Sequence, residues 1–137
     1  MEYTIDEAFA RPAALYQALG HPVRLQILDV LAQGEACVCH LTTVLGKRQP
    51  YVSQQLAALR EAALVSDRRE GTLIYYRIRD PRLVALLALG RTLAGGESGS
   101  TGERARISEG PVPDCPCPRC QAASGRLISP STIHLHA

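Results

Sequence analysis

The sequence predicts a mainly α-helical domain that carries one small β-hairpin. Hydrophobic residues make up 46% of the 137-residue chain, yet it has one Phe and no Trp, so any core must be built from aliphatic side chains. Apolar residues recur at helical spacing over most of the first 94 residues, and they alternate over one short stretch within them. Together these features favour an α-rich fold.

The first two predicted helices cover about residues 6–19 and the segment from Pro22 to the residue before Gly34. Pro12 lies inside the first helix and is a potential break or kink, because proline lacks a backbone N–H. Pro22 suits the first position of the second helix, and Gly34 suits its end. The apolar stripe of this second helix consists of Val23, Ile27, Val30 and Leu31.

Two short helices joined by a tight turn are predicted next. The first covers about residues 38–45 and is closed by Gly46, and the second opens at Pro50. Its apolar stripe consists of Val52, Leu56, Leu59 and Ala63. Two short helices around a glycine-containing turn, with basic residues at the junction, are typical of a helix-turn-helix unit.

The second helix of such a unit is the one that enters the major groove of DNA. If the Val52 stripe is buried, Gln54 and Glu61 project to the opposite side, with Tyr51 and Ser53 beside them. Gln and Ser can hydrogen-bond base edges, and the alternative is that they are ordinary surface groups. The predicted DNA contacts are Lys47, Arg48, Gln49, Tyr51, Ser53, Gln54, Arg68 and Arg69.

Residues 65–79 predict a β-hairpin around Glu70-Gly71. Ile74, Tyr76 and Ile78 alternate with Leu73, Tyr75 and Arg77, so one face can pack on the core and the other can face water. Arg68 and Arg69 lie beside the turn, where long cations reach backbone phosphates. A hairpin in this position is the wing of a winged helix-turn-helix domain.

The charge distribution agrees with a nucleic-acid partner. The net charge is +2, but residues 1–46 carry two basic and five acidic residues, whereas residues 47–79 carry seven basic and three acidic ones. Such a local excess is either a solvated face or a basic stripe that faces phosphate.

A last helix is predicted over about residues 81–94, and it is apolar nearly all round. Such a helix needs two partners, its own core and, we expect, the same helix of a second copy. Burial within one subunit is the alternative. Residues 1–94 are therefore expected to form the DNA-binding and dimerisation domain.

Residues 95–137 are expected to form a flexible tail, because they begin with Gly, Ser, Thr and charged residues that cannot bury a core. The tail carries Cys115, Cys117 and Cys120, and it ends with His134 and His136.

Four motifs in order resemble the ArsR/SmtB family of metal-responsive repressors, in particular its arsenic-sensing type. They are LGHPVRLQIL at residues 19–28, EACVCHL at residues 35–41, QPYVSQQL at residues 49–56 and YYR at residues 75–77, and the similarity spans about residues 13–94. The resemblance implies a homodimeric winged helix that binds operator DNA when ligand-free and leaves it when a toxic ion binds. It also implies an ion site at Cys37-Val38-Cys39, although His40 stands where the family's arsenic and cadmium sensors carry an acid. The zinc and nickel site of the family's last helix is not expected here.

The two thiols also carry a chemical argument of their own. Thiolates select soft ions, and a helix N-terminus assists their deprotonation. On a regular helix, Cys37 and Cys39 would point roughly 200° apart. One ion could then bind both sulfurs only if this turn is irregular, so binding is expected to distort the helix before the DNA-reading helix. The alternative is a pair of buried structural cysteines.

The resemblance implies As(III) or Sb(III) bound by three sulfurs, so the pair lacks at least one ligand. Our hypothesis is that one or more of Cys115, Cys117 and Cys120 completes the site. Alternatively, these three hold an ion by themselves, with His134 or His136. Two other interpretations stay open: a repressor that responds to Cd(II), Pb(II), Zn(II) or thiol oxidation, and a zinc-stabilised binding module.

Enzymes and membrane proteins are not expected. No Ser, His and carboxylate grouping suggests a hydrolase, and Cys117-Pro118-Arg119-Cys120 lacks the strand-helix-strand frame of a dithiol oxidoreductase. No apolar run approaches the roughly 18–20 residues of a membrane span, and residues 1–10 are acidic, unlike a signal peptide. A cytoplasmic location is therefore expected, and it agrees with the odd number of cysteines, five.

Overall fold

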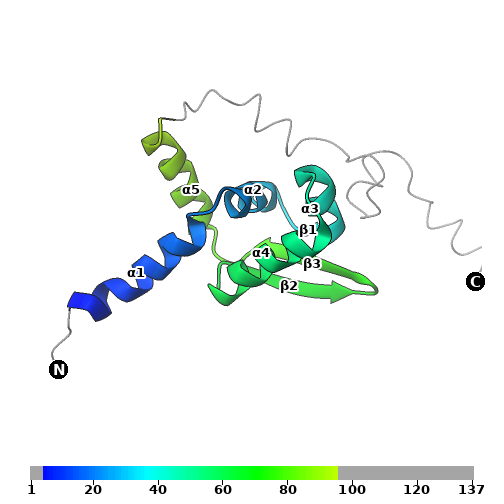
Figure 1. Cartoon of the computed structure of the whole chain (residues 1–137), viewed down its shortest axis with the longest axis horizontal. Coiled ribbons are helices and arrows are strands. Elements are labelled where there is room, and N and C mark those ends of the chain that lie inside the picture. The colour runs from blue at the N-terminus through cyan, green and yellow to red at the C-terminus, as the bar shows by residue number, and fades with distance from the viewer. Residues whose placement is uncertain (1–4, 96–137) are drawn as a thin grey trace, which may run out of the picture.

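The computed structural model describes residues 5–95, which form five helices and a three-stranded antiparallel sheet (Figure 1). The elements in chain order are α1 (Ile5–Leu19), α2 (Pro22–Leu31), β1 (Ala36–Cys37), α3 (Val38–Leu45), α4 (Gln49–Glu61), β2 (Val65–Glu70), β3 (Leu73–Ile78) and α5 (Arg82–Leu93). The predicted α-rich fold with one small hairpin is confirmed. The predicted tail lies outside the described residues except for Gly95, so its flexibility stays a prediction.

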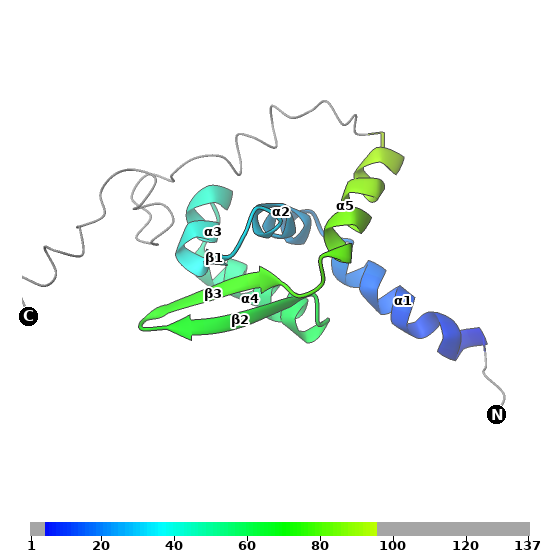
Figure 2. The ribbon, with the colours of Figure 1, turned by 180° about the vertical axis from the view of Figure 1, so that it is seen from behind.

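The elements are arranged so that the terminal helices and the wing lie at opposite ends. α1 and α5 lie at one end, the β2–β3 turn lies at the other, and α2, α3 and α4 lie between them (Figures 1 and 2). α1 continues through Pro12, so the potential break does not occur, although the ring removes one helical hydrogen bond. No helix within residues 5–95 is long and apolar enough to cross a membrane.

The core lies where α2, α3, α4 and the sheet meet. The predicted stripe of α4 is buried, since Val52, Leu56 and Leu59 are each 0% exposed. Ala63 was predicted to continue this stripe, and that prediction is wrong. α4 ends at Glu61, and Ala63 lies beyond it with a φ of 61°, because the chain must turn sharply there to enter β2. The largest fully buried side chains are Ile27, Leu28, Leu41, Leu56, Leu59, Val30, Val52, Val65 and Cys37.

The sheet has the strand order β1-β3-β2, and it contains one strand that periodicity did not predict. This strand, β1, has two residues, which pair with β3 as Ala36 opposite Tyr76 and Cys37 opposite Tyr75. Two residues are too few for an alternating pattern to be visible in the sequence. β1 places the segment that leads into α3 directly against the wing.

One face of the hairpin differs from the prediction. One face was predicted to face water, but Tyr76, which packs on the core, and Tyr75, on the opposite face of β3, are each only 7% exposed. Tyr75 is covered because it lies opposite Cys37 on one side and beneath the guanidinium of Arg68 on the other. β1 therefore converts part of the outer face of the wing into a second, smaller buried cluster.

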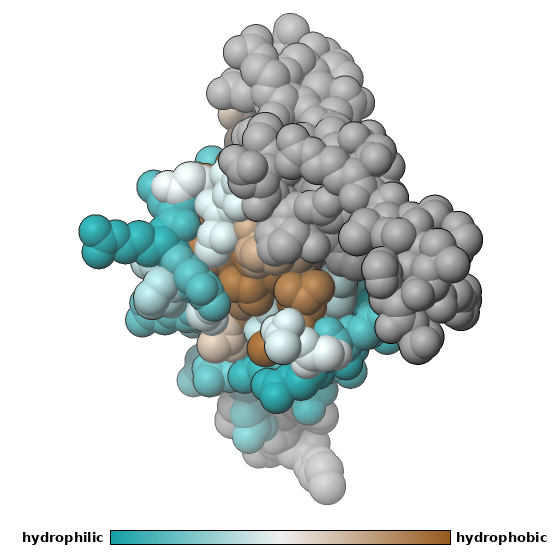
Figure 3. All heavy atoms as spheres, turned by 90° about the vertical axis from the view of Figure 1, so that its right-hand side faces the viewer, coloured by the Kyte–Doolittle hydropathy of each residue, from teal (hydrophilic) through white to brown (hydrophobic). Residues whose placement is uncertain are grey.

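The surface at the wing end is mainly hydrophilic. Seen from the side opposite α1, hydrophilic residues surround a smaller hydrophobic area (Figure 3). At the other end, α5 contributes one buried residue, Leu83, while Leu89 and Leu93 are 60% and 83% exposed. The described part of a single chain thus leaves most of this apolar helix uncovered.

The turn between α3 and α4 supports a stability prediction at Gly46. Gly46 caps α3 in the left-handed conformation, with a φ of 63°, and an added Cβ would have no atom within 4 Å. The cost of a side chain there is therefore conformational and not steric. We expect Gly46→Ala to lower the free energy of unfolding by about 1–2 kcal/mol, as measured by urea denaturation.

Gly46→Asn is the matched control, because asparagine tolerates the left-handed region better than alanine. It should reduce stability less than Gly46→Ala does. Equal reductions in the two variants would mean that the left-handed backbone is not the cause.

Candidate nucleic-acid interface and thiol site

The turn and the first half of α4 bring the predicted base and phosphate contacts together at one end of the helix. The buried stripe of α4 faces the core, which leaves the residues that precede and flank it on the surface. Lys47, Arg48, Gln49 and Gln54 are exposed, and Tyr51 and Ser53 are partly exposed. Arg48 is the N-cap of α4, so the start of the helix carries positive charge. This surface has the composition of a DNA-reading helix.

Arg24 holds this helix in place, a role that the sequence analysis missed. Its Nε donates a hydrogen bond to Gln55 Oε1 at 2.8 Å, and its Nη1 donates to the carbonyl of Ala18 at 3.3 Å. Gln55 is only 6% exposed although it is polar. Arg24, on α2, therefore links the end of α1 to α4. A buried Gln beside the Val52 stripe is the signal that could have indicated such a partner.

The two wing arginines, both predicted to contact phosphate, point to opposite faces of β2. Arg68 lies opposite Tyr75 and Arg69 opposite Ile74, and neighbours on a strand project to opposite sides. Arg69 is exposed and has no ion-pair partner within residues 5–95. The two side chains therefore have different surroundings.

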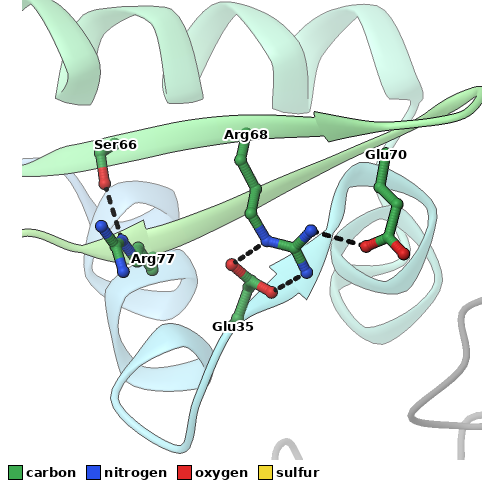
Figure 4. A network of polar contacts seen from close by, with 5 residues as sticks. All are labelled: Glu35, Ser66, Arg68, Glu70 and Arg77. Carbon is green, nitrogen blue, oxygen red and sulfur yellow. Dashed lines mark hydrogen bonds and ion pairs between the residues drawn. The ribbon is translucent and has the colours of Figure 1, made fainter.

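Arg68 is held by two carboxylates (Figure 4). Its Nε and Nη2 donate to the two carboxylate oxygens of Glu35 at 2.8 and 2.6 Å, and its Nη1 donates to Glu70 at 2.6 Å. The Arg68 guanidinium lowers the pKa of Glu35, chiefly through these hydrogen bonds. The pair therefore stabilises the fold at neutral pH, and this contribution disappears as the pH falls through the lowered pKa.

Cys37 is the N-cap of α3 and not a residue of the helix. Its backbone is extended, with φ −85° and ψ 163°, and its Sγ accepts a hydrogen bond from the backbone N–H of His40 at 3.4 Å. Because Cys37 precedes the helix, the separation of roughly 200° that a regular helical turn would impose on the two side chains does not apply. The backbone is irregular at this point, which is what binding of one ion by both sulfurs would require.

Cys39 belongs to the same small cluster as Cys37. Cys37 and Tyr75 are its buried members, and Cys39 and Leu73 pack against them. Cys37 is 1% exposed and Cys39 is partly exposed. His40, which follows Cys39 directly, is 2% exposed. The structure thus places two thiols in one cluster at the N-terminus of α3.

The thiol pair has no complete ligand set within the described part of the chain. Among residues 5–95, no three Cys, His, Asp or Glu side chains lie close enough together to hold a metal ion. The chemistry of two sulfurs fits part of a site for a soft ion, and such a site would need a further ligand from outside these residues. The candidate ligands Cys115, Cys117 and Cys120, like His134 and His136, lie outside the described residues.

A third surface is formed by the terminal helices. A cavity of about 430 Å³ lies between α1, α2 and α5, and its lining includes Tyr16, Leu19, Leu25 and Leu87. Asp29 and Arg91 line it as well and form an ion pair at 3.1 Å. Phe9 and Tyr16 on α1 are 63% and 58% exposed. Exposed apolar surface on two neighbouring helices is typical of a protein–protein contact.

Comparisons with known proteins agree with this geometry. Residues 21–67 match the family model described as "Bacterial regulatory protein, arsR family". A biofilm growth-associated repressor of Agrobacterium fabrum is 45% identical over 75 residues, which cover 55% of this chain and 64% of the relative. The arsenical resistance operon repressor of Escherichia coli is 42% identical over 72 residues, which cover 52% of this chain and 62% of the relative. The matched segments thus span slightly less than two thirds of these two relatives.

The solved structures extend the match over a whole domain. The homodimeric winged helix-turn-helix DNA-binding domain of a possible ArsR-family transcriptional regulator from Mycobacterium bovis is 37% identical, with a TM-score of 0.63. The match covers 73% of this chain and 94% of that domain. This chain therefore belongs to the ArsR family of bacterial regulatory proteins, whose members are winged helix-turn-helix transcriptional regulators and not enzymes.

Proposed function

We propose that this protein is a homodimeric transcriptional repressor that binds operator DNA when ligand-free and is released when As(III) or Sb(III) binds its thiolates. The observation that carries the proposal is the position of Cys37 and Cys39. They lie together at the N-terminus of α3, the helix that directly precedes the DNA-reading helix α4. An ion bound there acts on the DNA-reading unit itself.

On the DNA side, α4 supplies the groups that read sequence. Gln49, Ser53 and Gln54 are exposed or partly exposed near its start, where recognition helices contact base edges. Lys47 and Arg48 at the turn, and Arg69 on the wing, are exposed cations placed to contact phosphates. In this proposal Arg68 is not among the phosphate contacts, because Glu35 and Glu70 surround it.

On the ion side, binding competes with contacts that the thiols make in the ligand-free protein. The Sγ of Cys37 accepts the His40 N–H and is buried beside Tyr75. A soft ion would have to displace these contacts to reach the sulfur, and a tail cysteine would supply the third sulfur. If the displaced state binds DNA less well, the ion weakens DNA binding by the same factor by which DNA weakens ion binding.

Support for the inducer comes from one relative and from ligand chemistry. The E. coli relative is an arsenical resistance operon repressor, and thiolates prefer soft ions in general. The same pair of thiols would also bind Cd(II), Pb(II) or Zn(II), or respond to oxidation because Cys39 is partly exposed. These alternatives share the architecture and differ only in the signal.

A second copy of the chain is the proposed occupant of the surface on α1 and α5. The matched mycobacterial domain is homodimeric, and in this chain the end of the fold formed by α1 and α5 exposes Phe9, Tyr16, Leu89 and Leu93. A two-fold dimer through these helices would present two reading helices to a palindromic operator.

The DNA interface is tested by two substitutions with different signatures. Gln54→Ala should cost about 1–3 kcal/mol on the cognate operator and little on random DNA, because a base contact carries sequence information. Arg69→Gln should weaken binding to both DNAs and reduce the slope of log K against log salt by about 1, because one phosphate is no longer neutralised. Fluorescence anisotropy with both DNAs over a range of salt concentrations measures these effects. Equal weakening of both DNAs by Gln54→Ala would remove Gln54 from the reading set.

The inducer is tested by titrating the protein–operator complex with arsenite, cadmium, zinc and peroxide in turn, again by anisotropy. We expect arsenite to release the DNA, and serine replacement of both Cys37 and Cys39 to abolish release. Serine replacement of Cys115, Cys117 and Cys120 together should also abolish it if the tail supplies the third sulfur.

The outcomes separate the hypotheses. Release by cadmium or peroxide but not by arsenite would assign the signal to the alternative class. An unchanged arsenite response in the tail variant would discard the tail ligands. Indifference to every agent would leave the cysteines with a structural role.

The dimer is tested at the exposed residues of α5. Leu93→Glu combined with Leu89→Glu should yield a monomer in sedimentation velocity, because two charges cannot be buried in an apolar interface without partners. Gln33→Glu, which adds charge at an exposed position beyond α2, is the control and should remain dimeric. A dimer that persists in the double variant would place the interface elsewhere.

A further inference from the structure

A row of three side chains crosses the whole sheet at the thiol site. Cys37 on β1 lies opposite Tyr75 on β3, and Tyr75 lies opposite Arg68 on β2. Residues directly opposite each other in antiparallel strands project from the same face. The Arg68 guanidinium lies over the Tyr75 ring, 4.5 Å from its centroid. The buried sulfur and the wing cation are therefore separated by a single aromatic ring.

An ion pair gives a second connection, between the start of β1 and β2. Glu35 precedes Cys37 by two residues, and both of its carboxylate oxygens receive hydrogen bonds from Arg68 (Figure 4). A two-point contact between guanidinium and carboxylate fixes orientation as well as distance. These contacts form a closed ring. It runs along the chain from Glu35 to Cys37, across the sheet to Tyr75 and Arg68, and back to Glu35 through the ion pair. We call this set, Glu35, Cys37, Arg68 and Tyr75, the wing latch.

The surroundings of Arg68 argue against a phosphate contact. Its side chain is 49% exposed, but its donors are already directed to Glu35 and Glu70. A phosphate would have to displace at least one carboxylate. Arg69 differs on each count, since it is exposed on the other face and has no ion-pair partner within residues 5–95.

We propose that the wing latch couples the thiols to the wing, with Glu35 and Arg68 as positioning residues that transmit a displacement of Cys37 to β2. This inference rests on the proposed function and names its route of regulation. Cys37 is 1% exposed, so a reagent reaches its sulfur only if β1 or Tyr75 moves. β1 contributes two paired residues to the sheet, and the ion pair adds a direct connection from its start to β2. Movement of β1 therefore displaces β2, the strand that also carries Arg69.

The test compares Arg68→Gln with the wild-type protein in three measurements: operator affinity without ion, arsenite affinity without DNA, and operator affinity with arsenite. The first two should stay within about threefold of wild type, because a partly exposed ion pair contributes little energy by itself. The operator affinity in the presence of arsenite should change most. At coupled sites, one ligand typically changes the affinity for the other by a factor of about 5–150. In Arg68→Gln, the factor by which arsenite weakens operator binding should fall to about 2 or less.

Matched variants separate the latch from general effects of charge. Glu35→Gln should reproduce the Arg68→Gln result, whereas Glu70→Gln should not, because Glu70 lies on the same strand as Arg68 and does not join β2 to β1. The double variant Glu35→Arg, Arg68→Glu exchanges the two charges and should restore part of the release of the operator by arsenite. If Arg68→Gln instead weakens ion-free binding and its salt dependence as Arg69→Gln does, Arg68 is a phosphate contact and the proposal is wrong.

A measurement without any ion keeps this inference separate from the proposed function. In the ion-free protein, backbone amides of β1 and β3 should exchange hydrogen faster in Arg68→Gln than in wild type, and Arg69→Gln should leave them unchanged. Failure of arsenite and the other agents to release the wild-type protein would reject the proposed function and not the latch. Unchanged exchange in Arg68→Gln would overturn the latch whatever the signal is.

Discussion

The junction at Cys37 is the constraint on which the rest of this structure depends. This one residue ends β1 and caps α3, so it belongs both to the sheet and to the DNA-reading unit. Its sulfur accepts a hydrogen bond from a backbone N–H of α3 while its backbone pairs with β3. A change in the chemistry of the sulfur must therefore alter either the start of α3 or the pairing of β1, because both depend on where this residue lies.

The core explains why such a change could be felt at a distance. α2, α3, α4 and β3 bury their apolar residues against one another in one continuous cluster, and Arg24 adds a polar link from α2 to α4. Close-packed interiors transmit small displacements because they contain little free volume. The reading helix and the wing are attached to the same core, so they cannot respond independently to movement at the N-terminus of α3.

The helices were predictable because their apolar stripes are long enough to show a period. Val52, Leu56 and Leu59 indicated the buried side of α4, and Gly46 indicated the end of α3, since few other residues adopt its left-handed backbone. β1 could not be predicted from two residues without a repeating pattern. The burial of Tyr75 could not be predicted either, because it depends on β1 and on the Arg68 side chain from the neighbouring strand.

The sequence by itself determined the class of fold, the order of its elements, the position of the helix proposed to read DNA and the residue types that carry thiol chemistry. These follow from periodicity, turn residues and local spacing, which are properties of neighbouring residues in the chain. Tertiary structure decided that Cys37 lies outside α3, that Tyr75 is buried, and that Arg68 is held by Glu35 while Arg69 is not. Glu35 and Arg68 are 33 residues apart, and only the pairing of β1 with β3 brings them within hydrogen-bonding distance.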